Sequence, residues 1–276
     1  MNIDFYTYVV DWEEFKDIQI AFLKASVPDV EIQTDIGIKG LVYRVAKNNN
    51  VKYIITGADF RTEGKIPLCW TYMDGKYIKS VHKKFGKKKL KTFPNFTLSD
   101  RFYYTFIKKI KLRSILDLVD YNKEEARKII EKELDWKSYG GKHYESVYTR
   151  FIQSYLLPKK FNIDKRIVHY SALIRSGQMN REEALNKLKN EPPYPEDKIK
   201  EDKDYVIKKL GLSKEEFEKI LAQPPKTFLD YPTYFPLISS LKKPLKLIYR
   251  TISTAPPTIF DEMTLFEEDM KKNFTK

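Results

Sequence analysis

The densest group of chemically useful side chains lies in residues 139–150, which read YGGKHYESVYTR. The adjacent glycines allow the backbone to approach a ligand closely, and the Glu-Ser pair is a predicted helix start. Backbone N–H groups at a helix start attract anions. This cluster therefore predicts an anion-binding site built from Lys142, His143, Glu145 and, about one turn further along the helix, Arg150.

A second basic cluster lies in residues 165–176, which the sequence pattern predicts as a helix that ends at Gly177. Lys165 and His169 are four residues apart, so they share one helical face, and Arg166 lies beside them. For both clusters, a ligand-binding role and a plain capped or solvated helix remain open on these grounds alone.

Other kinds of site are excluded by the sequence. A single cysteine, Cys69, permits neither an internal disulfide nor a cysteine-based zinc site, and no two of the three histidines have HxxxH spacing. The signatures GxGxxG, GxxxxGK[ST] and GxSxG do not occur. The apolar runs are far too short to span a bilayer and no secretion signal follows Met1, so we expect a cytoplasmic protein without a membrane partner.

The positive charge of the chain is concentrated in one segment. The net charge is +13, and residues 76–113 alone hold thirteen basic residues and one acid, Asp100, for a charge of +12. Such a block predicts a surface that faces anions, namely nucleic acid, phosphates or acidic sugars. A solvated lysine-rich face would give the same pattern, and the aromatic residues among the charges also fit helix packing.

The elements that must position these residues begin with an α/β pattern. Residues 4–10 and 51–57 predict two buried strands, and residues 12–24 predict an amphipathic helix with Asp11 and Glu14 as a capping box. A second helix, capped by Thr34 or Asp35 and ended by residues 48–50, would bury one face: Ile38, Leu41, Val42 and Val45. Strands joined by a helical crossover predict a parallel sheet that is covered on both faces.

The loop from Thr56 to Gly64 follows the second predicted strand. Ligands of parallel sheets gather at the carboxyl ends of the strands, so this loop is a candidate for ligand binding. An ordinary turn after a strand would have the same composition.

Beyond residue 113 the pattern is helical throughout. Three capping-box pairs precede apolar residues at helical spacing: Asn122 with Glu125, Asn180 with Glu183, and Ser213 with Glu216. Residues 146–157 predict a helix that ends at Pro158. We expect a loop or linker at residues 191–200 and another break at Pro224 and Pro225.

Five strings of this sequence resemble the N-acetyl sugar amidotransferase family: VVDWEEFKDIQIAFLKASVPD, KYIITGADFRTEG, YIKSVHKKFG, YGGKHYESVYTRFIQSYLLPKKF and IDKRIVHYSALIRSGQMNREEAL. The resemblance runs from about residue 4 to about residue 190, and the rest matches more loosely. The family belongs to the PP-loop, or ATP-pyrophosphatase, superfamily and is linked to surface polysaccharides such as lipopolysaccharide O-antigen. The fold that it implies is α/β: a truncated Rossmann-like PP-loop parallel sheet (adenine nucleotide alpha-hydrolase-like) followed by a mostly α-helical domain.

The resemblance implies an ATP-dependent amidotransferase that converts an acetamido group of an N-acetylated nucleotide sugar to an acetamidino group. ATP activates the amide oxygen, AMP and pyrophosphate leave, and ammonia attacks the activated carbon. The implied cofactors are ATP and Mg²⁺, and the implied partner is an ammonia-supplying glutaminase–synthase pair similar to the histidine-pathway enzymes. This chemistry needs cations and amides around the phosphates and a dry pocket, but no protein nucleophile.

Individual roles follow from the resemblance by motif. Thr56, Gly57 and Asp59 match the second nucleotide loop of the superfamily, and Glu63 resembles a magnesium or ammonia-site carboxylate. The GKHYES-type motif implies catalytic roles for Lys142, His143 and Glu145. The same motif and the DKR-type helix of the family imply substrate contacts from Arg150, Lys165, Arg166 and His169.

One part of the superfamily pattern is missing, the SGGxDS loop that binds pyrophosphate. We therefore expect residues 1–75 to be the C-terminal part of the PP-loop domain, residues 76–113 a basic connecting segment, and residues 114–276 a helical substrate or partner domain. The chain would be a fragment, a subunit whose loop comes from a separate chain, or a degenerate relative. Whether it is an active enzyme by itself stays open.

Two other functions also stay open. A tRNA-modifying PP-loop enzyme would explain the +12 segment, but no nucleic-acid-binding motif accompanies that charge, so nucleic acid is not the expected partner. A non-catalytic subunit that binds a partner or a sugar would explain the missing loop. Steeply salt-dependent binding of tRNA would favour the first, whereas stabilisation by a UDP-N-acetyl sugar without ATP would favour the amidotransferase or the non-catalytic subunit.

Overall fold

The computed structural model describes residues 3–139, 141–142, 144–252 and 258–274. Most of these residues are helical, and a small parallel sheet joins the helices. Along the chain the elements are α1 (Trp12–Ala25), α2 (Ile32–Asn48), β1 (Tyr53–Thr56), α3 (Gly75–Phe85), α4 (Leu98–Phe102), η1 (Tyr103–Ile107), β2 (Lys111–Ser114), η2 (Ile115–Leu118), α5 (Lys123–Leu134), α6 (Val147–Phe151), η3 (Ile152–Leu156), α7 (Leu157–Phe161), α8 (Arg166–Arg175), α9 (Arg181–Asn190), α10 (Glu196–Leu210), α11 (Lys214–Ala222), η4 (Phe228–Asp230), α12 (Phe235–Ser240), α13 (Lys242–Ile252) and α14 (Thr258–Phe274).

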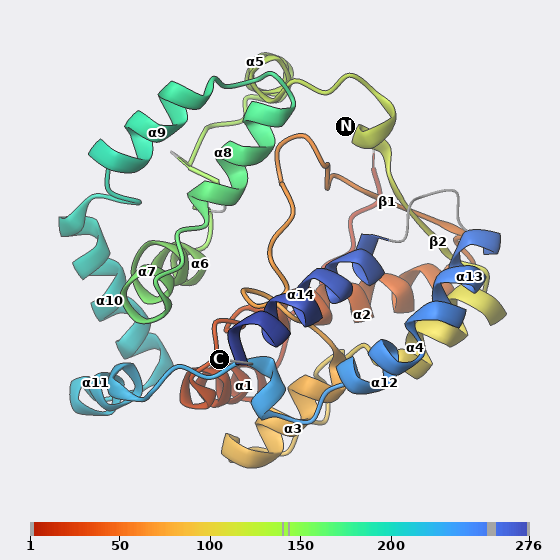
Figure 1. Cartoon of the computed structure of the whole chain (residues 1–276), viewed down its shortest axis with the longest axis horizontal. Coiled ribbons are helices and arrows are strands. Elements are labelled where there is room, and N and C mark those ends of the chain that lie inside the picture. The colour runs from red at the N-terminus through yellow and green to blue at the C-terminus, as the bar shows by residue number, and fades with distance from the viewer. Residues whose placement is uncertain (1–2, 140, 143, 253–257, 275–276) are drawn as a thin grey trace.

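One hydrophobic core connects the two halves of the chain. Phe22 of α1, Tyr77 of α3, Phe151 of α6 and Phe217 of α11 are fully buried in the same cluster. Figure 1 shows α5 to α11 as an arc along one side of the molecule, while α12 to α14 return to the side of α1 to α4. The return is held in place where the Tyr231 hydroxyl donates to the carbonyl of Ala25 over 2.7 Å.

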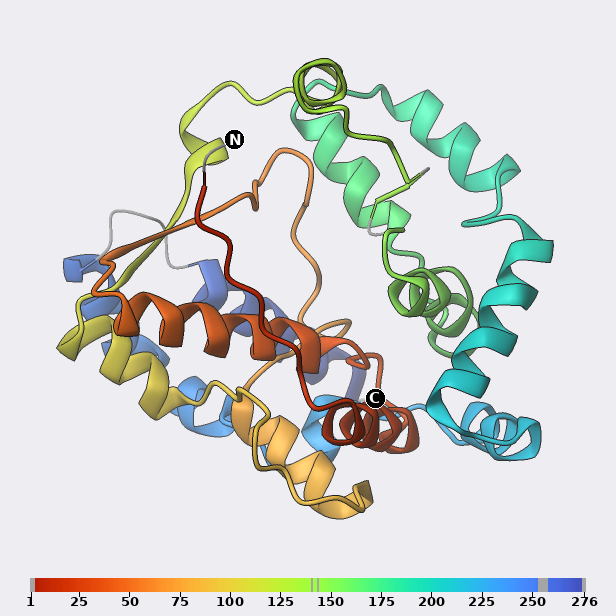
Figure 2. The same cartoon turned by 180° about the vertical axis from the view of Figure 1, so that it is seen from behind.

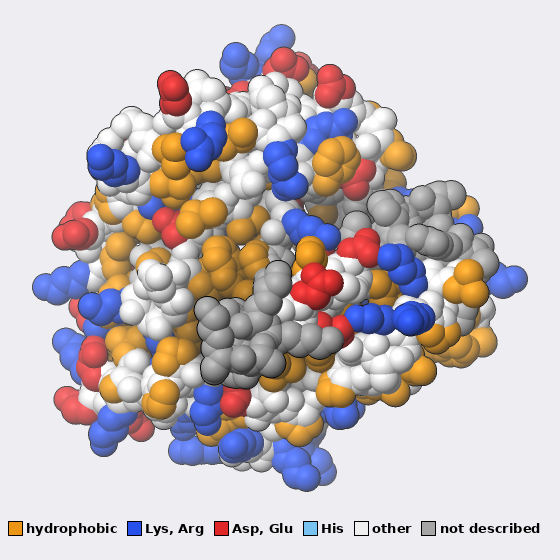
Figure 3. Space-filling view, in the orientation of Figure 1, with side chains coloured by type: hydrophobic (Ala, Val, Ile, Leu, Met, Phe, Trp, Pro, Cys, Tyr) orange, Lys and Arg blue, Asp and Glu red, His pale blue; other side chains and the backbone are white. Residues whose placement is uncertain are grey.

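The C-terminal helices α13 and α14 are joined by ion pairs. Lys246 lies 2.6 Å from Asp261, and Lys242 pairs with Glu267. Figure 3 shows basic and acidic side chains next to one another on this face of the molecule. The positive charge here is therefore partly neutralised within the chain.

Four of the helix starts expected from capping residues are confirmed, although the reciprocal capping-box bond occurs among them only between Ser213 and Glu216. Asp11 accepts a hydrogen bond from the Glu14 amide at the start of α1, and Asn122, Asn180 and Ser213 cap α5, α9 and α11 in the same way. The side chain of the cap accepts a hydrogen bond from an amide that has no partner within the helix. Because the cap and this amide lie close in sequence, the start of the helix can be predicted from the sequence alone. From Ile115 onward, every element within the described residues is helical, as expected.

The strands that form the sheet differ from those expected. Residues 4–10 are extended but form no strand, and Figure 2 shows them as a trace that runs past α2. The Tyr8 hydroxyl instead donates to the Thr92 carbonyl over 3.0 Å. The partner of β1 is β2, which pairs with it in parallel from Tyr53–Lys111 to Thr56–Ser114. The prediction of a strand at residues 4–10 and of its pairing with residues 51–57 was therefore wrong, although β1 is confirmed and the sheet is parallel.

The sheet is also less covered than expected. Ile54 is buried with Ala46 of α2 and Ile110, but Tyr53 and Ile55 on the other side of β1 are 60% and 66% exposed. The two-stranded sheet thus packs on one face only within the described structure, against the prediction of two covered faces. A Rossmann-like PP-loop sheet remains a prediction.

Helix α2 buries a different face from the one predicted. It begins at Ile32 rather than after Thr34 or Asp35, and Ile38 is 57% exposed, with Val42 also exposed. Its buried residues are instead Ile32, Gln33, Ile36, Gly37, Gly40 and Ala46. The chain around Pro94 crosses the helix closely at the two glycines. A Cβ added to Gly40 would lie 2.1 Å from the Pro94 carbonyl oxygen. Apolar periodicity could not reveal this contact.

Two predicted boundaries were also wrong. The helix of residues 146–157 continues through Pro158 to Phe161, because the π-helical turn η3 precedes the proline and accommodates its ring and missing N–H. The expected linker at residues 191–200 is half helical, since α10 begins at Glu196 directly after Pro195. The break at Pro224 and Pro225 is confirmed, because α11 ends at Ala222.

Candidate functional site

A cavity of about 560 Å³ lies beside α8, and we call it the α8 cavity. Its wall combines the loop after β1, the start of α5, the loop before α6, and the proline-rich turn before α10. The lining residues are Thr62, Lys123, Gly141, Lys142, Tyr144, Gln153, Asp164, Lys165, Arg166, His169, Tyr170, Leu173, Glu191, Pro192, Pro193, Tyr194 and Pro195. Cations and aromatic rings dominate this wall.

Helix α8 supplies the predicted basic cluster. Lys165 is the residue before the helix, and Arg166 and His169 follow within its first turn and a half, so all three reach the cavity. Arg166 binds the Asp164 carboxylate over 2.7 Å and donates to the Glu191 carbonyl over 2.7 Å. Arg166 therefore also holds the proline-rich turn against α8.

The loop after β1 packs directly against α8. The Asp59 carboxylate accepts hydrogen bonds from both the amide and the hydroxyl of Thr62, over 2.7 and 2.6 Å. Gly64 has φ +70°, and a Cβ there would lie 2.6 Å from the Val168 carbonyl oxygen. This turn and this close approach together bring Thr62 to the wall of the cavity.

Lys142, in the segment before α6, contacts the loop after β1. Its ammonium lies 3.1 Å from the Glu63 carboxylate and donates to the Thr62 carbonyl over 3.3 Å. Burial, and then the charge of Lys142, lower the pKa of the neighbouring Lys123. Burial is thus the main cause of the lowered pKa of Lys123, and the charge of Lys142 adds to it.

Lys165 and Lys123 differ from Lys142 and Arg166 because no carboxylate of the described residues lies within ion-pair distance of either. Lys165 is the more informative of the two because its charge also reaches buried acids. Two acids interact with it at longer range. Burial raises the pKa of Asp29 to about 7, although the Tyr72 amide, the Tyr77 hydroxyl and the charge of Lys165 act in the opposite direction. Burial likewise raises the pKa of Glu31, again opposed by Lys165.

Asp29 and Glu31 were not predicted from the sequence. The signal was present, since both acids interrupt the apolar segment VPDVEI, where a buried carboxylate needs partners. Tyr144, Tyr170 and Tyr194 were missed as well, because nothing in their spacing shows that they meet at one cavity.

Arg150 lies outside the lining of the cavity. Its guanidinium grips Asp202 of α10 with two hydrogen bonds of 2.7 Å, and Asp202 is only 5% exposed. It also donates to the Tyr144 carbonyl over 3.2 Å and lies 4.9 Å from the centre of the Tyr194 ring. Arg150 thus contacts Tyr144 and Tyr194, two residues of the cavity wall, without lining the cavity itself.

The remaining predicted residues are placed as follows by the structure. Lys142, Lys165, Arg166 and His169 line the cavity, Glu63 contacts it through Lys142, and Asp59 shapes the loop. Gly57 and Glu145 are exposed and do not line it, and the Thr56 hydroxyl accepts from the Ala58 amide. His143 lies outside the described residues. Their roles in binding or catalysis stay predictions.

The family comparison matches this part of the chain. Residues 145–243 match the family model described as LPS biosynthesis protein WbpG-like, C-terminal domain. The match covers less than half of the chain, from the start of α6 into α13, and includes Arg150, Lys165, Arg166 and His169. Comparisons with curated proteins and with solved structures found no match.

The expected cofactors fit the described residues only in part. No group of three or more His, Cys, Asp or Glu side chains that could hold a metal occurs among them. Glu63 is bound to Lys142, so it suits Mg²⁺ only as one ligand of an ion whose other ligands are substrate phosphates.

No helix in the described part of the chain is long and apolar enough to cross a bilayer.

Proposed function

We propose that the chain binds an N-acetylated nucleotide sugar in the α8 cavity and acts in lipopolysaccharide or related surface-glycan biosynthesis, in the ATP-dependent conversion of the acetamido group to an acetamidino group. The observation that carries this proposal is the excess of cations in a cavity with aromatic walls. The partial match to an LPS biosynthesis family model supports the pathway. The amidation itself rests on the sequence resemblance.

The charge balance of the cavity favours a diphosphate. The lining holds four cations and two acids, Asp164 and Glu191. Asp164 is occupied by Arg166, and Glu63 pairs with Lys142, whereas Lys165 has no carboxylate within 4.0 Å in the described structure. A nucleotide sugar brings two negative phosphates, which would complete the charge balance around Lys165 and Lys123. Lysine suits this role because it binds phosphate as a point charge.

The size and apolar walls of the cavity favour the rest of the ligand. Its volume of about 560 Å³ lies in the range of small-molecule sites. Tyr170 and Tyr194 provide aromatic side chains for contact with a base or a sugar, and three prolines add apolar surface to the same cavity. Exclusion of water would protect an activated amide from hydrolysis.

The roles of the chain in the reaction are binding and positioning. Lys165 would hold the diphosphate, and the Glu63–Lys142 pair would face the acetamido end of the sugar. ATP, when bound, supplies the activating adenylyl group, and ammonia comes from a partner such as a glutaminase–synthase pair. A loop that binds pyrophosphate would have to be added to the described residues for turnover.

Calorimetric titration with UDP-N-acetylglucosamine, without ATP, tests the binding step. We expect Lys165→Met to weaken binding at least tenfold, because one charge-assisted phosphate contact is lost. The exposed Lys128→Met on α5 is the matched control and should bind like the unchanged chain. Equal affinity of Lys165→Met and the unchanged chain, with both folded by circular dichroism, would reject the proposal.

A further inference from the structure

The basic segment of residues 76–113 builds a second cavity, which we call the basic groove. Its volume is about 670 Å³, and it shares no lining residue with the α8 cavity. It is lined by Gly40, Arg44, Lys79, His82, Lys83, Lys88, Lys89, Leu90, Lys91, Thr92, Phe93, Pro94, Asn95, Phe96, Thr97, Asp100 and Tyr104. The proposed amidotransferase function leaves this groove unused.

Buried acids of α1 hold the backbone of the groove, not its lysine side chains. The Glu14 carboxylate accepts from the amides of Lys91, Thr92 and Phe93 at 2.8 to 3.2 Å. The Asp17 carboxylate accepts from the amides of Lys87 and Lys88, each over 2.8 Å, and pairs with His82. The acids thus fix the path of the loop while the ammonium groups stay in solvent.

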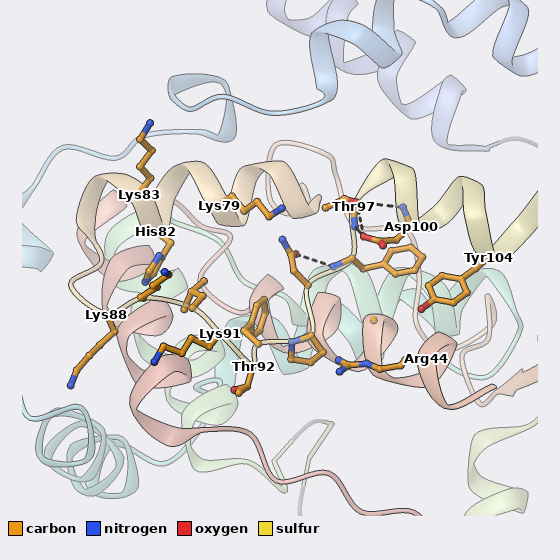
Figure 4. Close-up of a pocket in the computed structure, with 17 residues that line it drawn as sticks. Arg44, Lys79, His82, Lys83, Lys88, Lys91, Thr92, Thr97, Asp100 and Tyr104 are labelled. Atoms are coloured by element: carbon orange, nitrogen blue, oxygen red, sulfur yellow. Dashed lines mark hydrogen bonds between the residues drawn. The ribbon is translucent and has the colours of Figure 1, made fainter. Parts of the chain in front are cut away.

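The cations of the groove are largely unneutralised. Within the described residues, Arg44, Lys79, Lys83, Lys89 and Lys91 have no carboxylate within 4.0 Å, and Lys88 lies 3.9 Å from Glu13. The acid in the lining, Asp100, is occupied by the amide and hydroxyl of Thr97. Figure 4 shows Arg44 and Lys79 pointing from opposite sides toward the segment between them.

The floor of the groove is apolar. Of the apolar residues in the lining, Pro94 and Phe96 are buried, whereas Leu90, Phe93 and Tyr104 are half-buried and offer surface to a ligand. Phe96 and Tyr104 stack with their ring planes within 8° and their centres 6.1 Å apart. A floor of rings between cationic walls suits a ligand with a charged edge and a flat apolar edge.

We propose that the basic groove binds a single strand of nucleic acid, with phosphates against the lysine walls and bases toward the aromatic floor. A single phosphate would leave most of a 670 Å³ groove unfilled. A planar bilayer cannot enter a concave groove, and a duplex hides its bases from the floor. An acidic peptide satisfies the walls but offers no flat ring for the floor. The sequence motifs did not predict this partner, because the groove is assembled from α2, α3 and the loop between α3 and α4.

Fluorescence anisotropy with a labelled oligouridylate tests the proposal on the full chain. If about four phosphates are neutralised, the logarithm of the affinity should fall with the logarithm of salt with a slope of about −3. Binding should then weaken roughly fiftyfold between about 50 and about 200 mM salt. A duplex of the same length should bind more weakly than the single strand, and a duplex that binds equally well would overturn the proposal.

Two matched double variants locate the site. Lys79→Ala/Lys91→Ala removes two groove cations, whereas Lys128→Ala/Lys132→Ala removes two exposed lysines of α5 and changes the net charge equally. We expect the groove variant to bind about tenfold more weakly and with a shallower salt slope, and the α5 variant to bind normally. Equal losses in both variants would show only a general charge effect and would reject the groove.

Competition decides between classes of polyanion. Unlabelled oligouridylate should displace the labelled strand, while poly-glutamate at equal charge should displace it much less, because it lacks bases. Displacement by poly-glutamate at the same concentration would make the partner an acidic polypeptide and overturn our inference. Preferential binding to phosphatidylglycerol vesicles would overturn it in favour of a lipid surface. Retained binding of the UDP sugar by the groove variant keeps this test separate from that of the α8 cavity.

Discussion

The guanidinium of Arg150 and the ammonium of Lys165 illustrate how differently two predicted substrate contacts are placed. Arg150 donates its hydrogen bonds to Asp202 and the Tyr144 carbonyl. Lys165 instead lines the cavity without a close carboxylate in the described residues. A bidentate pair with a buried acid is costly to break, because the remaining charge has no solvent. Two basic side chains of the same candidate cluster can therefore differ in role, one serving stability and the other binding.

We predict that Arg150→Met destabilises the protein by about 3 kcal/mol, because it leaves the Asp202 carboxylate buried without its partner. Chemical denaturation measures this loss. Arg127→Met is the control, since Arg127 pairs only with exposed acids of α5 and should change stability by less than about 0.5 kcal/mol. A fully stable Arg150→Met that has lost affinity for the UDP sugar would instead assign Arg150 to the substrate.

The packing of α2 against the loop between α3 and α4 makes a prediction about glycine. Gly40→Ala should lower stability by about 1–3 kcal/mol, because its Cβ would meet the Pro94 carbonyl at 2.1 Å and the backbone must move. Gly57→Ala is the matched control, since a Cβ there meets nothing within 4 Å. Thermal unfolding compares the two. A Gly40→Ala protein as stable as the unchanged chain would show that this close approach is not maintained.

The contact between α1 and the basic groove predicts acid sensitivity. Burial raises the pKa of Glu14, but the hydrogen bonds from Thr92, Lys91 and Phe93 outweigh it, so the pKa lies below its usual value of 4.5. The pKa of Asp17 is also lowered, because hydrogen bonds from Lys88, His82 and Lys87 outweigh the effect of burial. Because both folded pKa values lie below the unfolded ones, their contribution to stability is complete above about pH 5 and is lost as the pH falls through the folded values.

Glu14→Gln should therefore cost about 2 kcal/mol at pH 7 and much less at a pH below the lowered pKa of the native carboxyl, where that carboxyl is also protonated. Denaturation at both pH values measures the difference, and hydrogen exchange should show that the amides of residues 91–93 lose protection first. Glu13→Gln, at an exposed acid of the same helix, should have little effect at either pH. A loss for Glu14→Gln that is independent of pH would contradict the assigned role of the carboxylate.

At the scale of the whole molecule, the partly exposed sheet bears on whether this chain can bind a nucleotide. One side of β1 is exposed, and the loop after it uses the Asp59 carboxylate to fold on itself. We predict that this chain alone binds ATP weakly or not at all, because the sequence has no SGGxDS loop to surround the phosphates with amides. Calorimetry should detect no micromolar ATP site, and a micromolar site would count against the interpretation of the chain as lacking its phosphate loop.

The sequence by itself determined several helix starts and the basic residues of the candidate site. The sequence predicted helix capping by Asp11, Asn122, Asn180 and Ser213. Each of these hydrogen bonds joins residues only two or three positions apart. The basic residues of α8 and Lys142 could be named because their charge and spacing lie within short segments. The resemblance to an amidotransferase family also depended on these short strings.

Only the tertiary structure decided which segments meet. The pairing of β1 with β2, the crossing of α2 by Pro94 and the Arg150–Asp202 pair join residues about 50 positions apart, and their choice depends on the shape of the packed core. Residues 4–10 have the composition of a strand, but the edge of β1 was taken by a segment that buries Ile110 beside Ile54. The same packing turned a run of lysines into a groove, because buried Glu14 and Asp17 took the loop amides and left the ammonium groups in solvent.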